Sequence, residues 1–261
     1  MLKKMLNTAS SRIIILTICL GCSAHAVLAQ SNVGPRMAKE AVEAARTGNK
    51  YLFLLFYDKK DDLFNQMEET VNSFVKSTDK KVLVYESSAK DPKEIDVVYK
   101  YRINKAPLPM LLVIGPNGAV VGGFPKSVTA DKLSKSFMAP VVMEVLKTLQ
   151  EQKMAIVMLQ NSRTKFNAES AKAAQDLAYD KQFVGQVEIV KADPADPANK
   201  DFLVNAKLTG AMAEAAIVLI APPGVVAGVF QGNTTKAAII SSLSSGGACG
   251  SGGGCGPKGC S

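Results

Sequence analysis

Cysteine and histidine are missing from most of this 261-residue chain. No cysteine lies between Cys22 and Cys249, and the single histidine is His25. A Ser-His or Cys-His catalytic pair and a histidine-based metal site are therefore excluded from the body of the chain. No Gly-x-Gly-x-x-Gly or phosphate-loop spacing opens a helix after a strand, which excludes the common nucleotide-binding motifs. The sequence predicts an architecture and a compartment, but no reaction.

A strong excess of charge is also missing. The formal net charge is +8, and it falls to +5 without Lys3, Lys4 and Arg12, because the first 29 residues contain no acidic residue. The remaining basic residues alternate with acidic ones, as in residues 90–94 (KDPKE). This pattern indicates a mixed solvated surface, so we expect no nucleic-acid partner.

The first 29 residues have the layout of a secretory signal. Three basic residues precede an apolar run at residues 13–21, and small residues follow up to Ala29. That run is too short to span a membrane as a helix. We expect residues 1–29 to be removed after Ala29, which leaves a mature chain that begins at Gln30. The expected location is periplasmic or secreted, in a bacterium.

An alternative to this cut is a lipoprotein box at Leu20-Gly21-Cys22. Cys22 would then carry a lipid and would anchor the protein to a membrane. Cys19 stands three positions before Cys22, where lipoproteins usually have leucine. The sequence leaves both alternatives open, and membrane association is expected only with lipidation at Cys22.

Two stretches that lie 106 positions apart repeat one pattern. Residues 110–118 (MLLVIGPNG) and 216–224 (AIVLIAPPG) each read as a buried strand that ends in a Pro/Gly turn. Each leads into a second apolar run, which closes at Phe124 and Phe230. The offset is 102 where Phe64-Asn65 matches Phe166-Asn167, and we attribute the difference to a longer loop at residues 193–197. One α/β module is thus present twice.

The periodicity of apolar residues predicts the same order of elements in both copies. In the first copy we expect helices at residues 36–46, 63–76, 95–101 and 129–137, and strands at 51–56, 81–85, 110–114 and 119–123. In the second copy we expect helices at 140–150, 167–179, 200–207 and 234–243, and strands at 155–159, 187–191, 216–220 and 225–229. Pro140 would break a helix that continued from the first copy, so it marks the boundary. The predicted domains are residues 30–138 and 139–243, followed by a tail at 244–261.

This order, βαβ followed by a hairpin and a final helix, resembles the thioredoxin fold. The most specific match is residues 109–118, which look like the apolar strand and Asn-Gly turn that follow the cis-proline of that family. The topology matches over residues 36–243, whereas the motifs match only over residues 101–124. The resemblance implies an α/β protein of two tandem thioredoxin-like domains, each a central mixed sheet flanked by helices, with a disordered C-terminal tail.

The catalytic motif of that family is absent. In redox-active members, a Cys-x-x-Cys lies between the first central strand and the next helix, whose N-terminus lowers the pKa of the thiol. The same places hold Asp61 and Phe64 in the first copy and Arg163 and Phe166 in the second. We expect Asp61 to cap the helix, and both phenylalanines to be core residues on its apolar face.

The resemblance also implies a polypeptide partner, because non-catalytic thioredoxin-like domains hold substrates in the disulfide isomerase family. Pro109 would be the cis-proline, and with Ala106 and Pro107 it would form the partner-binding site. The second copy has Ala215 at the place of Pro109, which weakens the case for an equivalent groove there.

The tail at residues 244–261 is rich in glycine and serine, and we expect it to be flexible. It contains all three cysteines of the mature chain, Cys249, Cys255 and Cys260. Three thiols suit Cu(I), or Zn(II) with a fourth ligand from outside, although the spacings are looser than the Cys-x2-Cys of ordinary zinc sites. Alternatively, two of them pair as a disulfide, or the tail exchanges thiols with a partner.

These observations predict an exported, redox-inactive thioredoxin-like binding or scaffold protein with a thiol-bearing tail. Two alternatives stay open at this point. One is a thiol-disulfide oxidoreductase that uses the tail cysteines, and the other is a soft-metal binding protein that uses the same residues.

Overall fold

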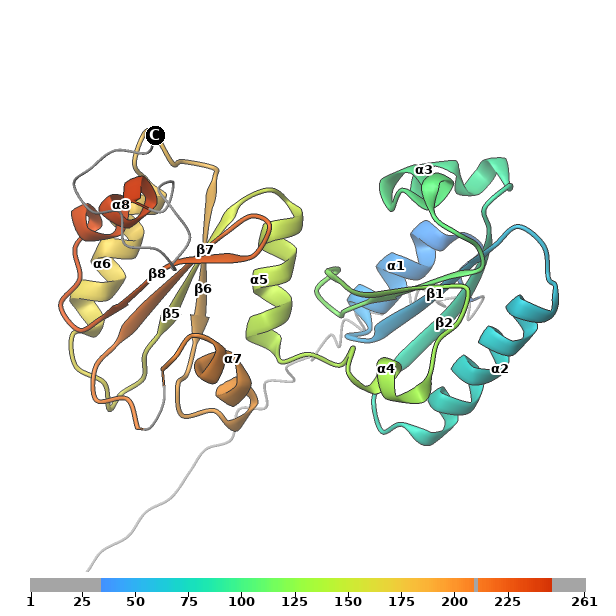
Figure 1. Cartoon of the computed structure of the whole chain (residues 1–261), viewed down its shortest axis with the longest axis horizontal. Helices are drawn as coiled ribbons and strands as arrows, with labels where there is room; N and C mark the ends of the chain where they lie inside the picture. The colour runs from blue at the N-terminus through green and yellow to red at the C-terminus, as the bar shows by residue number, and fades with distance from the viewer. Residues whose placement is uncertain (1–33, 209–210, 246–261) are drawn as a thin grey trace, which may run out of the picture. The chain divides into compact units, whose positions relative to one another are not determined.

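The computed structural model describes residues 34–208 and 211–245 and contains two four-stranded mixed sheets. The strand order is β2-β1-β3-β4 in the first and β6-β5-β7-β8 in the second (Figure 1). In each, the first strand of the copy pairs in parallel with the second and antiparallel with the third. The hairpin then adds the fourth strand. This is the thioredoxin arrangement, so the predicted fold class of two tandem thioredoxin-like domains is confirmed.

The elements follow the predicted order closely. The strands are β1 (Tyr51–Tyr57), β2 (Val82–Ser88), β3 (Met110–Ile114), β4 (Val120–Pro125), β5 (Met154–Leu159), β6 (Val187–Ala192), β7 (Ala216–Ala221) and β8 (Val225–Gln231). The helices are α1 (Ala38–Thr47), α2 (Asp62–Ser77), α3 (Ile95–Lys100), α4 (Ala130–Ser134), α5 (Pro140–Gln150), α6 (Asn167–Ala178), α7 (Lys200–Asn205) and α8 (Lys236–Ser245). Three short 3-10 turns were not predicted: η1 (Pro92–Glu94), η2 (Ile103–Lys105) and η3 (Pro197–Asn199).

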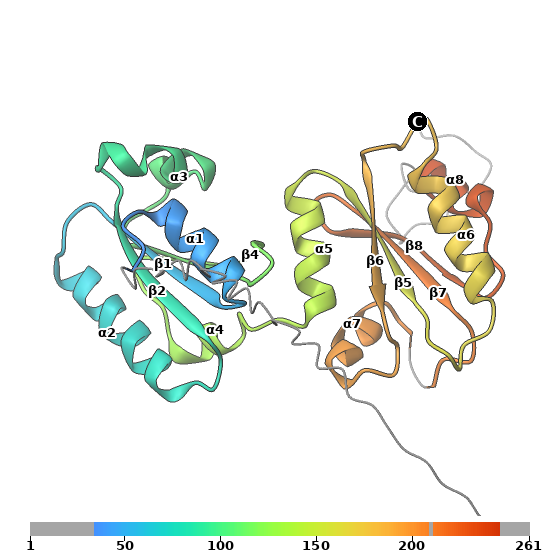
Figure 2. The same cartoon turned by 180° about the vertical axis from the view of Figure 1, so that it is seen from behind.

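Helices cover both faces of each sheet (Figures 1 and 2). In the first domain, α2 and α4 pack on one face, and α1 and α3 pack on the other. The central strand β1 is therefore buried from Tyr51 to Phe56 on both sides, which explains why its sequence is apolar without alternation. In the second domain, α6 and α8 cover one face, and α5 and α7 cover the other.

The turns of the two hairpins confirm the repeat. Gly118 N–H donates to the Gly115 carbonyl at 2.8 Å, and Gly224 N–H donates to the Ala221 carbonyl at 2.8 Å. Gly118 has a φ of 87° and Gly224 a φ of 131°, a backbone conformation that side chains with a Cβ rarely adopt. Both copies therefore end their buried strand with the same glycine, for the same steric reason.

The explanation of the offset between the copies was wrong. Strands β2 and β6 are already 105 residues apart, before residues 193–197 are reached. The extra residues instead lie between the first strand of the copy and its helix, where residues 160–166 in the second copy replace residues 58–61 in the first. The insertion thus falls in the loop that carries the redox motif in catalytic thioredoxins.

Glu94 caps helix α1 from a distant part of the chain. Both of its carboxylate oxygens accept from Ala38 N–H at 3.0 Å, and its side chain is buried. Tyr85 Oη–H also donates to Glu94 at 3.3 Å. Burial first, and the Glu94 carboxylate second, raise the pKa of Tyr85 to about 12. A carboxylate at a helix N-terminus satisfies an amide that has no partner within the helix.

The second copy solves this end differently. Helix α5 begins with Pro140, which has no N–H to donate. The residue that corresponds to Glu94 is Asn199, whose side-chain amide donates to the Asp193 carbonyl at 2.9 Å. A carboxylate is therefore present only in the copy where an amide needs it.

We predict that Glu94→Ala lowers the free energy of unfolding by about 1–3 kcal/mol, because it leaves the Ala38 amide and the Tyr85 hydroxyl without their buried acceptor. Chemical denaturation followed by circular dichroism measures the change. Glu43→Ala on the exposed side of the same helix is the matched control. Equal stability of the two variants would show that the Glu94 contacts contribute nothing.

Candidate functional site

The turn between β1 and α2 holds no reactive group at the place of the redox motif. Asp61 is the N-cap of α2, and its Oδ1 accepts from Phe64 N–H at 3.1 Å. The Phe64 side chain is fully buried, and its ring lies edge-on to Tyr57 with centroids 4.9 Å apart. Both predictions are confirmed: one thiol position holds a helix cap, and the other holds a core residue.

A group of charged side chains surrounds this turn. Lys60 forms an ion pair with Glu86 of β2, and its ammonium lies 5.3 Å from the Tyr57 ring centroid and 5.0 Å from that of Phe64. The hydrogen bond to Glu86 raises the pKa of Lys60. The contact with the Glu86 carboxylate, and then burial, raise the pKa of Glu68. The turn is thus occupied by paired charges, and none of them is a nucleophilic thiol.

The proline predicted to be cis is cis. The Leu108–Pro109 bond has this geometry, and the Pro109 carbonyl accepts from Lys126 N–H at 2.7 Å. Pro109 is buried, Ala106 is half-buried and Pro107 is exposed. Within residues 34–208 and 211–245, the backbone N–H and C=O of Leu108 have no hydrogen-bond partner. This segment therefore presents free backbone groups at the end of β3, where Met110 lies opposite Phe56.

The corresponding segment of the second domain is closed by the inserted loop. Lys165 N–H donates to the Ala213 carbonyl at 3.0 Å, and its carbonyl accepts from Ala215 N–H at 2.8 Å. These two bonds form a parallel bridge between Lys165 and Glu214. Ala213 and Ala215 correspond to Pro107 and Pro109 at the offset of 106, so the second domain fills its own docking edge.

Phe166 is not the core residue that the sequence predicted. It is the N-cap of α6, with a φ of 61°, and 37% of it is exposed. The match between Phe64-Asn65 and Phe166-Asn167 is a coincidence, since the insertion moves Phe166 to the place of Asp61. No side chain caps α6 from this position. Arg163, the other predicted counterpart, is exposed in the loop, and its N–H donates to Asn161 Oδ1 at 2.8 Å.

Side-chain hydrogen bonds hold the inserted loop in shape. Thr164 Oγ1 accepts from Asn161 N–H at 2.9 Å and lies 2.6 Å from Asn167 Oδ1. Asn161 also reaches β6 through Asp193 Oδ1 at 2.7 Å, and this bond lowers the pKa of Asp193. Asn and Thr favour such local turns over regular helix, which explains why helix α6 starts late.

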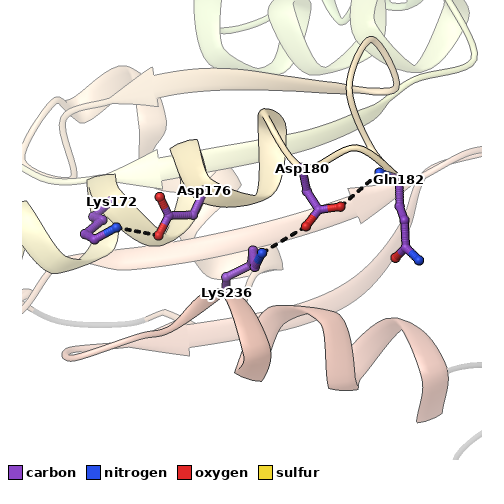
Figure 3. A network of polar contacts seen from close by, with 5 residues as sticks. All are labelled: Lys172, Asp176, Asp180, Gln182 and Lys236. Atoms are coloured by element: carbon purple, nitrogen blue, oxygen red, sulfur yellow. Dashed lines mark hydrogen bonds and ion pairs between the residues drawn. The ribbon is translucent and has the colours of Figure 1, made fainter.

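A hollow of about 680 Å³ lies beside the end of α6 and the start of α8. Figure 3 shows its polar groups: Lys236 pairs with Asp180 at 2.9 Å, and Asp180 also accepts from Gln182 N–H. Lys236 lowers the pKa of Asp180, and Asp180 raises that of Lys236. Lys172 and Asp176 form a second pair on α6. Because these charges satisfy one another, the hollow offers no unpaired charge to a ligand, and the contacts instead hold α8 to the domain.

The three cysteines proposed for metal binding, Cys249, Cys255 and Cys260, lie outside the described residues, as do Cys22 and the predicted signal. Over the described ranges, no group of three or more histidine, cysteine, aspartate or glutamate side chains is placed to hold a metal ion. None of the helices in that part of the chain has the length and apolar character needed to cross a bilayer.

No protein-family model and no curated protein matches the chain. Solved structures do align with it. The first two thioredoxin domains of Naumovozyma dairenensis Eps1p cover 86% of this chain and 99% of theirs, at 11% identity and a TM-score of 0.29. The bb fragment of ERp72 covers 80% and 93%, at 10% identity and 0.28. The alkylhydroperoxide reductase protein AhpF of Enterococcus faecalis covers 78% and 98%, at 16% identity and 0.30. The fold assignment rests on the strand order and register of this chain.

We predict that Glu68→Gln raises the melting temperature near pH 7. The pKa of Glu68 is raised in the folded state, so its favourable contribution is present only below the unfolded pKa and is lost as the pH rises through the folded value. The gain should vanish below about pH 3.5, where Glu68 is protonated in both states. Thermal melts across this range measure it, with the exposed neighbour Glu69→Gln as the control. A lower melting temperature for Glu68→Gln at pH 7 would contradict the repulsion from Glu86.

Proposed function

We propose that this protein is an exported, redox-inactive binding or scaffold protein whose first thioredoxin-like domain holds an extended polypeptide. The observation that carries the proposal is the difference between the two copies at the end of β3 and β7. Leu108 keeps its backbone groups free, whereas Lys165 occupies the corresponding segment of the second domain. An extended chain can add to such free backbone groups as a strand does, with side-chain specificity from the residues around it.

The surroundings of this segment fit a ligand that is held and not reacted with. Pro107 is exposed and Ala106 half-buried, so an apolar surface lies beside the free backbone groups. Between residues 34 and 245 the chain has no cysteine, so a bound polypeptide meets no thiol of either folded domain. Asp61, at the end of the neighbouring strand β1, has already used its carboxylate as a helix cap.

The docking proposal predicts an effect of Pro107→Asp that is absent at the equivalent position. This variant puts a desolvated charge into the docking surface, so we expect binding of a labelled, carboxymethylated unfolded polypeptide to weaken by at least about tenfold. Ala213→Asp in the second domain is the matched control and should bind as the unchanged protein does. Fluorescence anisotropy measures both, and circular dichroism verifies the folds. Equal affinities for the two variants would contradict docking at residues 106–109.

The tail cysteines Cys249, Cys255 and Cys260 complete the proposal as a site of thiol or soft-metal chemistry that is separate from the folded domains. With no thiol in either domain, we predict that the full chain reduces insulin disulfides no faster than dithiothreitol alone. The Cys255→Ser/Cys260→Ser variant should behave in the same way. Acceleration that this variant loses would instead establish an oxidoreductase that uses the tail. Native mass spectrometry with Cu(I) or Zn(II) tests the metal site, for which a mass shift must depend on these cysteines.

A further inference from the structure

The outer strands of the two sheets differ in how their free edges are protected. Each sheet has two edge strands, β2 and β4 in the first and β6 and β8 in the second. An exposed edge presents unpaired N–H and C=O groups to other strands, and proteins usually block it with charges, proline or a covering group. Glu86 lies in β2, and Glu188 and Lys191 lie in β6. Strand β8, with the sequence VVAGVFQ, contains neither a charge nor a proline.

Strand β4 shows what protection looks like at the matching place. Val120 N–H donates to Gln150 Oε1 at 2.9 Å, and Gln150 Nε2 donates to the Val120 carbonyl at 2.8 Å. The side-chain amide of Gln150 thereby takes the place of a further strand. Pro125, at the end of β4, adds a residue that has no N–H. The edge of the first sheet is closed by both means.

Val226 has the same place in the second sheet, without such a clamp. Val120 lies opposite Ile114 and Val226 opposite Ile220, each directly before an irregularity in the ladder. The outward direction of the Val120 backbone therefore applies to Val226 as well. Within the part of the chain that the structure describes, no side chain is placed against the Val226 backbone.

Val229 points its backbone outward too. Gly232 N–H donates inward to the Ala215 carbonyl at 2.9 Å, and the direction alternates along an antiparallel strand, so Val229 faces away from β7. Val226 and Val229 also share one face of the sheet, because their partners Ile220 and Val218 belong to one core cluster. The irregularity between them inserts the residue that makes this possible. Both side chains are exposed, at 47% and 39%.

We propose that β8 is a self-association edge and that its occupant is β8 of a second copy, paired antiparallel about a two-fold axis. Placing Val226 opposite Val229 of the second copy gives both residues outward-facing donors and acceptors, and brings four exposed valines together on one face. The pairing is self-complementary, as a two-fold interface requires. Residues 215–235 carry no charge, so no like-charge contact opposes it, and no charged feature selects a foreign strand.

The contact is small compared with a standard protein interface, so we expect a weak dimer whose fraction grows with concentration. Sedimentation velocity of the full chain, under reducing conditions that prevent tail disulfides, measures it from about 10 μM to about 1 mM. Val226→Lys places two ammonium groups at the pairing edge and should weaken the dimer by at least about tenfold. Val204→Lys, at an exposed valine of α7, is the matched control and should dimerise normally.

Hydrogen exchange gives a second and independent result. The Val226 and Val229 amides should become more protected as concentration rises, while the already paired Val120 amide should not change. A chain that stays monomeric up to about 1 mM overturns the proposal. So does a dimer that Val226→Lys leaves intact, or protection of the two amides by an added valine-rich peptide alone. Because Val226 is remote in sequence from Pro107, failure of this test leaves the polypeptide-docking test unaffected.

Discussion

The need of backbone N–H and C=O groups for partners decides where this protein can interact. Buried amides and carbonyls that lose water must be hydrogen-bonded, and the fold meets this need with residues that differ between its two halves. Glu94 supplies an acceptor to helix α1, Lys165 pairs with the segment before β7, and Gln150 completes the edge of β4. The two places that lack such a residue, Leu108 and strand β8, are therefore the places where another chain can bind.

The loss of redox chemistry follows from the same rule at the start of α2. A helix N-terminus carries free amides and a partial positive charge, which in a catalytic thioredoxin stabilises a thiolate. Here Asp61 accepts from the Phe64 amide and takes up that stabilisation as a permanent carboxylate. The paired charges of Lys60 and Glu86 lie beside it, so the turn contributes to stability and has no group to transfer electrons.

Periodicity predicted most of the fold, because local packing dictates it. Strand β3 and helix α5 begin and end at the predicted residues, and the cis geometry of Pro109 follows the family pattern. Phe166 could not be placed in this way. The insertion before α6 leaves the apolar period of the helix unchanged, so a chance Phe-Asn match concealed it. The signal for it was the cluster Asn161, Thr164 and Asn167, whose side chains compete for backbone groups and favour turns. The Lys165 bridge joins segments about 50 residues apart, and no local pattern encodes it.

Duplication explains why the two open edges lie in different halves. A module that is written twice starts with two docking segments and two hairpin edges, and each must be closed or used. In the first half, Gln150 of the following helix closes the hairpin edge, which leaves the docking segment at Leu108. In the second half, the longer loop closes the docking segment through Lys165, which leaves the hairpin edge at Val226. One copy can thus hold a polypeptide while the other pairs with its own kind, and neither role competes for the same backbone groups.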